Sequence, residues 1–226
     1  MLWVTIRQRS LSANVHPVHF VLASASPARL AILRAAGIDP SVVVSGVDED
    51  AVAAALTDPS PSELVTALAM AKAEAVVATV AGTHTDAVIV GCDSMLSIGG
   101  EMLGKPGTPE IARARWTDMA GRTGELLTGH AIIRIDGGVR AKDTSGSQTT
   151  VVRFADPTPA ELDAYIATGE PLAVAGSFTL DGLGGWFVEG IDGDPSSVIG
   201  ISLPLTRRLL AEVGVSVVDL WRSSTS

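Results

Sequence analysis

The feature that most constrains the fold is an alternation of short apolar runs with helix-forming segments. The runs at 20–22, 87–94 and 186–193 have the length and composition of buried strands. Several segments between them open with Ser-Pro or Thr-Pro, which is typical of an N-cap followed by the first helical residue. We therefore expect an α/β protein with a two-lobed mixed sheet, flanking helices and a central cleft.

Individual elements follow from local signals. Ser60, Pro61 and Glu63 form a capping-box pattern that predicts a long helix over 60–81. Glycine pairs predict two hairpins, one turning at 99–100 and one at 136–138 between two long strands. The remaining predictions are helices over 108–121, 158–169 and 203–214, a strand over 41–50 that runs into an acidic turn, and an edge strand over 215–221.

Length and composition indicate one ordered globular unit. The chain has 226 residues, of which 46% are hydrophobic and 18% charged, enough for a substantial core. Only 4% are aromatic, so Ala, Val, Leu and Ile must supply most of that core. We expect a flexible tail over 1–17, a single domain of two lobes over 18–222, and a disordered tail over 223–226.

Charge and cysteine content exclude several classes of protein. The net charge of −9 argues against stable nucleic-acid binding, although a local basic pocket would suffice for a small phosphorylated substrate. The single cysteine, Cys92, lies in an apolar run and fits a reducing cytoplasm. No uninterrupted apolar run reaches the ~20 residues of a membrane span, so no membrane association is expected.

The segment 19–38 predicts a strand, a tight turn and a helix with the features of an anion site. Ser24 and Ser26 supply hydroxyls, and Ser26 is suited to cap a helix that starts at Pro27. The helix N-terminus offers free N–H groups, and Arg29 adds a cation that the helix dipole would not favour there. A phosphate would satisfy this set of donors. The alternative is a capped helix with a surface arginine.

Three more charged positions have a functional and a structural interpretation. Asp93 is expected at the carboxyl end of the apolar strand, where ligands bind in α/β sheets, or else as a turn aspartate. Glu49, in the acidic cluster 48–50, could bind a hard cation through oxygen or lie in a solvated loop. Lys72 lies in an apolar helix and either serves the site or extends its amine to the surface.

Two basic residues complete the candidate site. Gly99, Gly104 and Lys105 have the spacing of a Walker A loop, but Pro106 stands where that loop needs a hydroxyl, so we reject this interpretation. Lys105 can still reach a phosphate from its hairpin, and Arg122 can cap a helix or meet an anion. Cations, carboxylates and a helix N-terminus together are what a Mg²⁺-bound polyphosphate requires.

The order of the motifs resembles that of the Maf family. The matching stretches include "LASASPARL", "GCDS", "GEMLGKP", "GRTGELLTG" and "DGLGGWFVEGIDGDPSSVIGISLP", and the similarity extends over about residues 19–213. The resemblance implies a nucleoside triphosphate pyrophosphatase with a two-lobed fold similar to that of inosine triphosphate pyrophosphatases. It also implies dependence on Mg²⁺ or Mn²⁺, a cytoplasmic location and a possible homodimer.

The resemblance assigns roles to the candidate residues. Asp93 stands at the family's catalytic aspartate, and Glu49 matches the acid that would hold the metal together with it. Lys72 and Lys105 match the family's two lysines. Ser24 and Arg29 match its phosphate loop.

Three positions depart from the family pattern and are associated with substrate choice. They are Ala28, Ser94 and Asp181. The reaction class therefore transfers from the resemblance, whereas the preferred base does not. Two alternatives are a non-catalytic septum or division regulator that acts by protein binding, and a phosphatase that releases orthophosphate.

Overall fold

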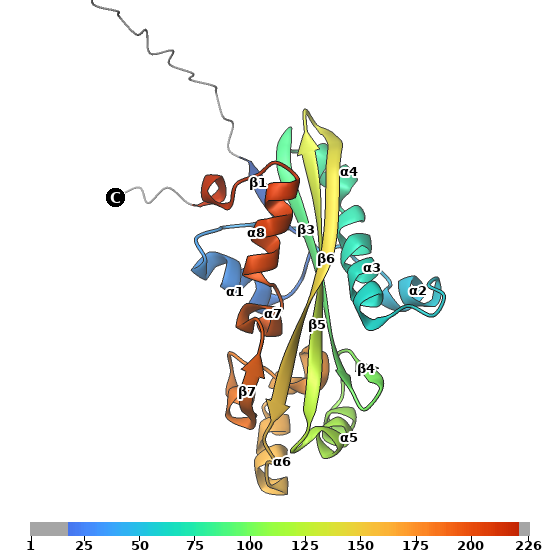
Figure 1. Ribbon diagram of the computed structural model, residues 1–226, viewed down its shortest axis with the longest axis vertical. Coiled ribbons are helices and arrows are strands. Elements are labelled where there is room, and N and C mark those ends of the chain that lie inside the picture. Colours follow the sequence, from blue (N-terminus) through green and yellow to red (C-terminus); the bar gives the residue numbers. More distant parts are fainter. Residues whose placement is uncertain (1–17, 222–226) are drawn as a thin grey trace, which may run out of the picture.

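The computed structural model describes residues 18–221 and shows a curled mixed sheet with helices on its faces (Figure 1). The expected tails over 1–17 and 223–226 lie outside the described residues. The strand order is β2-β1-β3-β5-β6-β7, with β4 also paired to β3. The strands are β1 (His19–Leu22), β2 (Ser41–Val42), β3 (Asp86–Ile98), β4 (Glu101–Leu103), β5 (Thr123–Asp136), β6 (Val139–Phe154) and β7 (Val188–Asp192).

Three long strands, β3, β5 and β6, lie next to one another and make up most of the sheet. β1 pairs in parallel with β2 and β3. The pairs β3–β5, β5–β6 and β6–β7 are antiparallel, which confirms the mixed sheet. Both predicted hairpins are present. Gly99 and Gly100 turn β3 into β4, and Gly137 and Gly138 turn β5 into β6, all with positive φ, which glycine adopts at little cost.

Four helices begin where the sequence predicts. Ser26, Ser60, Thr108 and Thr158 each accept a backbone N–H as N-cap, with proline as the next residue. The α-helices are α1 (Pro27–Ala35), α2 (Glu49–Ala54), α3 (Pro61–Glu74), α4 (Val77–Ala81), α5 (Pro109–Met119), α6 (Pro159–Ala167), α7 (Pro195–Ile199) and α8 (Leu203–Glu212). Short 3₁₀ turns are η1 (Glu170–Ala173), η2 (Ala175–Ser177), η3 (Leu183–Phe187) and η4 (Val217–Leu220).

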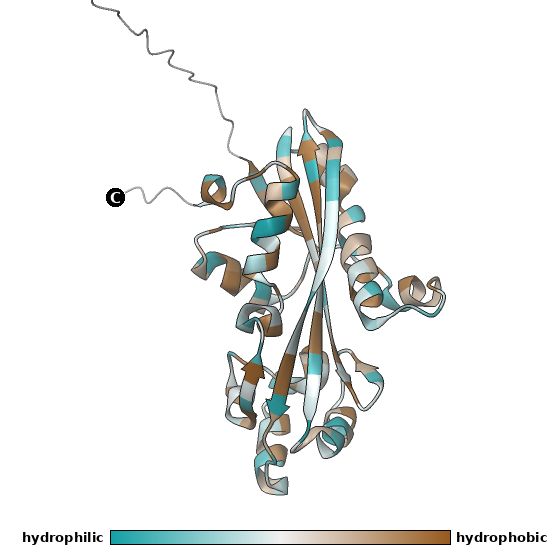
Figure 2. Ribbon diagram, in the orientation of Figure 1, coloured by the Kyte–Doolittle hydropathy of each residue, from teal (hydrophilic) through white to brown (hydrophobic). Residues whose placement is uncertain are grey.

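The apolar core divides into three clusters. In one half of the sheet, α1 and α8 cover one face and α3 and α4 cover the other, and their cores are almost entirely aliphatic (Figure 1). The other half is filled from α5, α6 and the 3₁₀ turns, and Trp116, Phe154, Tyr165 and Phe178 lie there. Figure 2 shows the apolar residues along these strands and the hydrophilic character of the first half of β6.

Three local predictions are corrected by the structure. Asp93 does not end a strand but lies inside β3, because pairing with β5 continues to Ser97 and the apolar pattern resumes at Leu96. The strand over 41–50 is limited to β2, and its acidic end is instead the start of α2. The edge strand over 215–221 is the 3₁₀ turn η4, in which Ser216 caps Val218.

One helical stretch of the described chain, Pro61–Ala81, is long and apolar enough to cross a membrane by length and composition. It contains no uninterrupted apolar run of that length, because Lys72 and two glutamates interrupt the sequence. Val65, Leu68, Ala69 and Ala73 on this stretch are buried in the protein. Such packing is that of a core helix.

Candidate functional site

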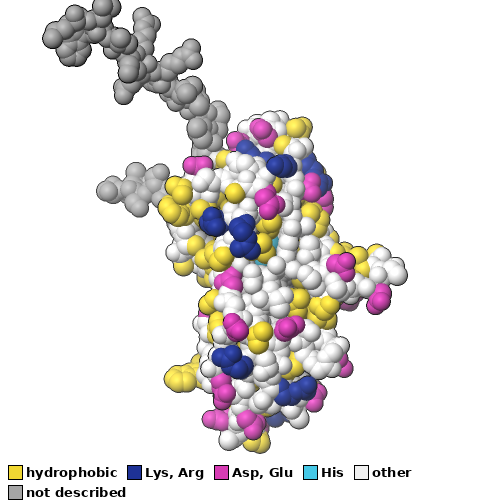
Figure 3. Space-filling view, in the orientation of Figure 1, with side chains coloured by type: hydrophobic (Ala, Val, Ile, Leu, Met, Phe, Trp, Pro, Cys, Tyr) yellow, Lys and Arg dark blue, Asp and Glu magenta, His cyan; other side chains and the backbone are white. Residues whose placement is uncertain are grey.

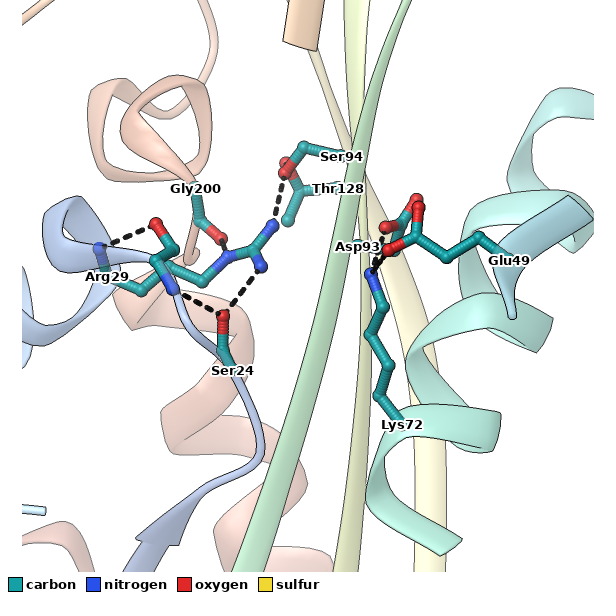
Figure 4. A network of polar contacts seen from close by, with 9 residues as sticks. Ser24, Arg29, Glu49, Lys72, Asp93, Ser94, Thr128 and Gly200 are labelled. Carbon is teal, nitrogen blue, oxygen red and sulfur yellow. Dashed lines mark hydrogen bonds and ion pairs between the residues drawn. The ribbon is translucent and has the colours of Figure 1, made fainter. Parts of the chain in front are cut away.

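The candidate site lies where β3 loses its neighbour on one edge. β1 pairs with β3 only as far as Val90, which accepts the last backbone hydrogen bond from Ala23 at 2.9 Å. β4 pairs with β3 only from Leu96 onward. Asp93 and Ser94 fall in the interval between these two strands. Since successive side chains of a strand point to opposite faces, Asp93 faces α3 and Ser94 faces α1 (Figure 4).

On the α3 side, one lysine holds two carboxylates. Lys72 Nζ lies 2.6 Å from Asp93 Oδ1 and 2.7 Å from Glu49 Oε1. Lys72 and Asp93 are both buried, whereas the Glu49 side chain is about half exposed at the start of α2. The three charges sum to −1 with all groups ionised, so the mouth of this cluster favours a cation. The surface interpretation of Lys72 is wrong, because its amine points inward (Figure 4).

Two glycines set the distance between α3 and the sheet. A Cβ on Gly91 would lie 2.2 Å from the carbonyl oxygen of Ala69, and one on Gly129 would lie 2.1 Å from that of Val65. Neither distance is possible, so the backbone of α3 lies directly on β3 and β5 only because these positions lack side chains. Lys72 follows Ala69 by about one turn and is thereby brought to Asp93.

On the opposite face, Arg29 is held by hydrogen bonds from its side chain to three partners. Its Nε donates to Gly200 O at 2.7 Å, Nη1 donates to Ser24 Oγ at 3.1 Å, and Nη2 donates to Ser94 Oγ at 3.1 Å. Arg29 is buried, so the interpretation as a surface arginine is wrong. A guanidinium carries five N–H groups, and the described residues leave one on each terminal nitrogen without a partner. That pair has the fork geometry that suits a phosphate.

The serines of the turn support this arginine. Ser24 Oγ also accepts the N–H of Ser26 at 3.1 Å, and Ser26 Oγ accepts the N–H of Arg29 at 3.4 Å as the cap of α1. Ala28 is half-buried in the same first turn. The two hydroxyls therefore stabilise the turn and also hold Arg29 in position.

A pair of polar residues on β5 was not recognised from the sequence. Thr128 Oγ1 lies 2.9 Å from Ser94 Oγ and donates to Ser197 O at 2.9 Å. His130 is fully buried, and burial followed by the charge of Arg29 lowers the pKa of His130 to about 4. The available signal was two polar residues, two positions apart, in an otherwise apolar strand. By contrast, Cys92 behaves as expected, since burial raises the pKa of its thiol to about 11.

Three other candidate residues of the described chain take no part in the hydrogen bonds and ion pairs of this cluster. Arg122 donates to Asp118 O at 3.0 Å and so caps α5. It precedes Gly129, the residue that pairs with Asp93, by seven residues, which span about 23 Å in an extended strand. Lys105 is exposed in the loop after β4. Asp181 is exposed in the loop between η2 and η3, which Glu170 braces by accepting hydrogen bonds from Thr179 and from Gly184 N–H.

The carboxylates fit a metal ion that arrives with a phosphate ligand. Within residues 18–221 there is no group of three or more His, Cys, Asp or Glu side chains that could hold a metal. Glu49 and Asp93 nevertheless converge on one nitrogen, at 2.7 and 2.6 Å. Mg²⁺ commonly uses one or two carboxylates and completes its shell with phosphate oxygens and water. The donor set therefore suits a metal shared with a polyphosphate better than a preformed metal cage.

Surface shape adds two grooves elsewhere. One, of about 550 Å³, lies between α3 and the middle of β6, and the other, of about 530 Å³, lies beside α6 and η3. Neither groove is lined by Asp93, Lys72 or Arg29, so neither coincides with the candidate site. Figure 3 shows acidic and basic side chains interspersed on the face in view, with no continuous basic patch there.

Comparisons with known proteins point to one family. A family model described as "Maf-like protein" matches residues 19–213. Relatives named nucleoside triphosphate pyrophosphatase include those of Saccharopolyspora erythraea, with 71% identity over 90% of this chain and 97% of the relative, and Nocardia farcinica, with 64% identity over 89% and 96%. A third, from Rhodococcus jostii, is 64% identical over 91% of this chain and 97% of its own length.

Proposed function

Because the chain belongs to the Maf-like protein family, we propose that it is a nucleoside triphosphate pyrophosphatase, a hydrolase acting on phosphorus anhydrides. The reaction converts a nucleoside triphosphate and water to the monophosphate and pyrophosphate. The observation that carries the proposal is the arrangement of charges on the two faces of β3. Lys72 is ion-paired to Asp93 and Glu49 on one face, and Arg29 lies on the other. A role in clearing non-standard or modified nucleotides follows from the same family inference.

The bond chemistry assigns a task to each charged residue. The oxygen of a water molecule attacks the α-phosphorus, the bond to the oxygen bridging the α- and β-phosphorus breaks, and pyrophosphate leaves with the bridging oxygen. Asp93 orients the water and accepts its proton. Arg29 binds phosphate oxygens through its two remaining N–H groups, and Lys72 neutralises part of the negative charge. Positioning and electrostatic stabilisation of this kind account for most of phosphoryl-transfer catalysis.

We propose that Glu49 and Asp93 hold Mg²⁺ or Mn²⁺ together with the substrate. When bound, such an ion neutralises phosphate charge and polarises the phosphorus that is attacked. The ion pairs of both carboxylates with Lys72 Nζ support this role, because they bring two oxygen donors from different elements to the same side chain. Lys72 offsets the repulsion between the two carboxylates.

The remaining substrate contacts rest on the family resemblance. Lys105 is proposed to reach the phosphates from its exposed loop, and Ser24 and Ser26 to hold the turn that contacts them. Ala28, Ser94 and Asp181 are proposed to influence base preference. Arg122 keeps the helix-capping role that the structure gives it.

The proposal extends to the setting of the enzyme. A cytoplasmic location is supported by a single, buried, unpaired cysteine. The net charge of −9 supports a nucleotide substrate without stable nucleic-acid binding. No membrane partner is proposed, since the most apolar helical stretch packs in the core. Homodimer formation rests on the family resemblance alone and is tested by light scattering of the purified protein.

Product analysis tests the reaction. The purified chain is incubated with a panel of ribo- and deoxyribonucleoside triphosphates and with Mg²⁺ or Mn²⁺, and both pyrophosphate and orthophosphate are measured. We expect pyrophosphate from at least one nucleotide and its loss in excess EDTA. Orthophosphate as the sole phosphate product would indicate a phosphatase, and no product would favour the non-catalytic division regulator. Activity that persists in EDTA would contradict the metal role.

A further inference from the structure

Behind Arg29 lies a layer of buried polar side chains on β5 that does not itself reach the open site. His130 Nε2 accepts the N–H of Ser202 at 2.8 Å, and its Nδ1 lies 3.1 Å from Thr128 O. Because Ser202 N–H is the donor, the neutral ring carries its proton on Nδ1 and donates it to Thr128 O. The hydrogen bond between Ser202 and His130 thus connects β5 to the segment that follows α7.

That segment supplies a partner of Arg29. Thr128 Oγ1 donates to Ser197 O, and His130 accepts from Ser202, so β5 holds this segment on both sides of Gly200. Gly200 O accepts the hydrogen bond from Arg29 Nε at 2.7 Å, and Gly200 has φ +136°, a conformation that side chains disfavour. The position of this carbonyl therefore depends on the two anchors.

We propose that His130 and Thr128 are positioning residues that fix the guanidinium of Arg29 through the segment 197–202. The inference rests on the proposed function, in which Arg29 binds the phosphates. Arg29 Nη2 also bonds to Ser94, whose hydroxyl contacts Thr128 directly (Figure 4). Thr128 thus acts on the arginine by two routes, whereas His130 acts only through the 197–202 backbone. A guanidinium that is already fixed in position binds phosphate more tightly, because its side chain loses less conformational entropy on binding.

Burial makes these contacts consequential. Thr128, His130, Ser197 and Ser202 are each fully buried, so water cannot replace a lost partner without entering the core. His130 faces Arg29 from α1 and Asp194 from the start of α7, and it pairs across the strands with Cys92. An apolar side chain at this position would leave the Ser202 N–H without an acceptor and free the Gly200 carbonyl to move.

The test is a comparison of substitutions at His130 and Arg29. His130→Leu should raise the KM for the best nucleotide about tenfold or more, a change of the size expected for a lost charge-assisted contact, while kcat changes by less than about threefold. His130→Gln should recover most of the loss, since its amide oxygen can accept from Ser202. Ile132→Val, on the same strand and face and equally buried, is the matched control and should leave both constants unchanged.

A double-mutant cycle separates positioning from a general structural role. If His130 acts through Arg29, then Arg29→Ala combined with His130→Leu should have the KM of Arg29→Ala alone. Effects that multiply, or a glutamine variant as impaired as the leucine variant, would overturn the proposal. Should His130→Leu fail to fold, Thr128→Val removes the other anchor and undergoes the same cycle.

Binding of inorganic tripolyphosphate, measured by calorimetry, makes the two proposals distinguishable. The inference predicts weaker binding for His130→Leu than for Ile132→Val, with recovery in His130→Gln. If the protein released no pyrophosphate from any nucleotide, the proposed function would fail while this binding order still decided the positioning role. Equal binding by all three variants would contradict it.

Discussion

At the scale of single residues, the site depends on charges that are buried but paired. Lys72 and Asp93 are each less than a tenth exposed, and each would be costly to bury alone. Glu49 adds a second carboxylate to the same amine from the exposed end of α2. Because Lys72 has two acidic partners, neutralising one of them leaves the lysine with a counter-charge.

Replacing Asp93 by asparagine should remove catalysis and preserve the fold. Asparagine has the same shape and can still accept from Lys72, but it cannot accept a proton or bind a cation with full charge. We expect kcat to fall by at least about 10²-fold, the lower limit of general-base contributions, in steady-state assays of pyrophosphate release. A thermal melt confirms folding.

Asp86→Asn provides the matched control for that substitution. Asp86 lies on the same strand and is ion-paired to Arg134 at 2.5 Å, at the far end of β3 from the site. It should retain kcat near the wild-type value. If folded Asp93→Asn also retained wild-type kcat, the catalytic role of Asp93 would be untenable and Glu49 would become the next candidate.

At the scale of elements, the site is a product of how α3 lies on the sheet. Gly91 and Gly129 face the helix backbone on neighbouring strands, and both would clash with it if they carried a Cβ. The helix supplies Lys72 and the strand supplies Asp93, so any outward movement of α3 lengthens the ion pair. Stability and activity are therefore coupled at this contact.

Gly129→Ala should accordingly impair both properties. Overpacking a close contact costs about 1–3 kcal/mol, so we expect the free energy of unfolding in urea to fall by about 2 kcal/mol or more, with a lower kcat in the folded fraction. Gly146→Ala on β6 is the control, because its Cβ would lie 3.7 Å from Leu205 in ordinary contact. Equal stability for the two variants would show that α3 can shift without cost.

At the scale of the whole molecule, the polar site lies in a sheet whose two halves have different cores. Aliphatic clusters flank one half, and an aromatic cluster with Trp116 fills the other. His130 borders the aliphatic cluster through its neighbour Cys92, where burial and the charge of Arg29 lower its pKa to about 4. The folded protein therefore favours the neutral form of the His130 ring.

This depressed pKa makes global stability dependent on pH. His130 has an ordinary pKa near 6.5 in the unfolded chain, so between about 6.5 and 4 the unfolded state binds the extra proton. The free energy of unfolding attributable to His130 should therefore fall by roughly 3 kcal/mol as the pH falls through this range.

Urea titrations of the wild type and His130→Gln at a series of pH values isolate this effect. Other groups titrate in both proteins, so the difference between the two curves reports His130. We expect the stability difference in favour of the wild type to shrink as the pH falls from 6.5 to 4. A difference that is constant with pH would mean that His130 titrates normally in the folded protein.

The sequence by itself determined the features that depend on near neighbours in the chain. The capped starts of α3 and α6, where Ser60 meets Glu63 and Thr158 meets Glu161, need only side chains within one helical turn. The turn at Gly137 and Gly138 likewise follows from local backbone conformation. Mixed α/β architecture follows from the order of such signals along the chain.

Only the tertiary structure decided how distant residues meet. Asp93 lies within β3 because β5 pairs beyond it, and Arg122 lies far from it because the same pairing extends β5 away from the site. The anchoring of Gly200 by Thr128 and His130 joins residues about 70 positions apart, which no periodicity encodes. Buried hydrogen bonds at such separations are chosen by packing, since a polar group in the core must find its partner wherever the fold brings one.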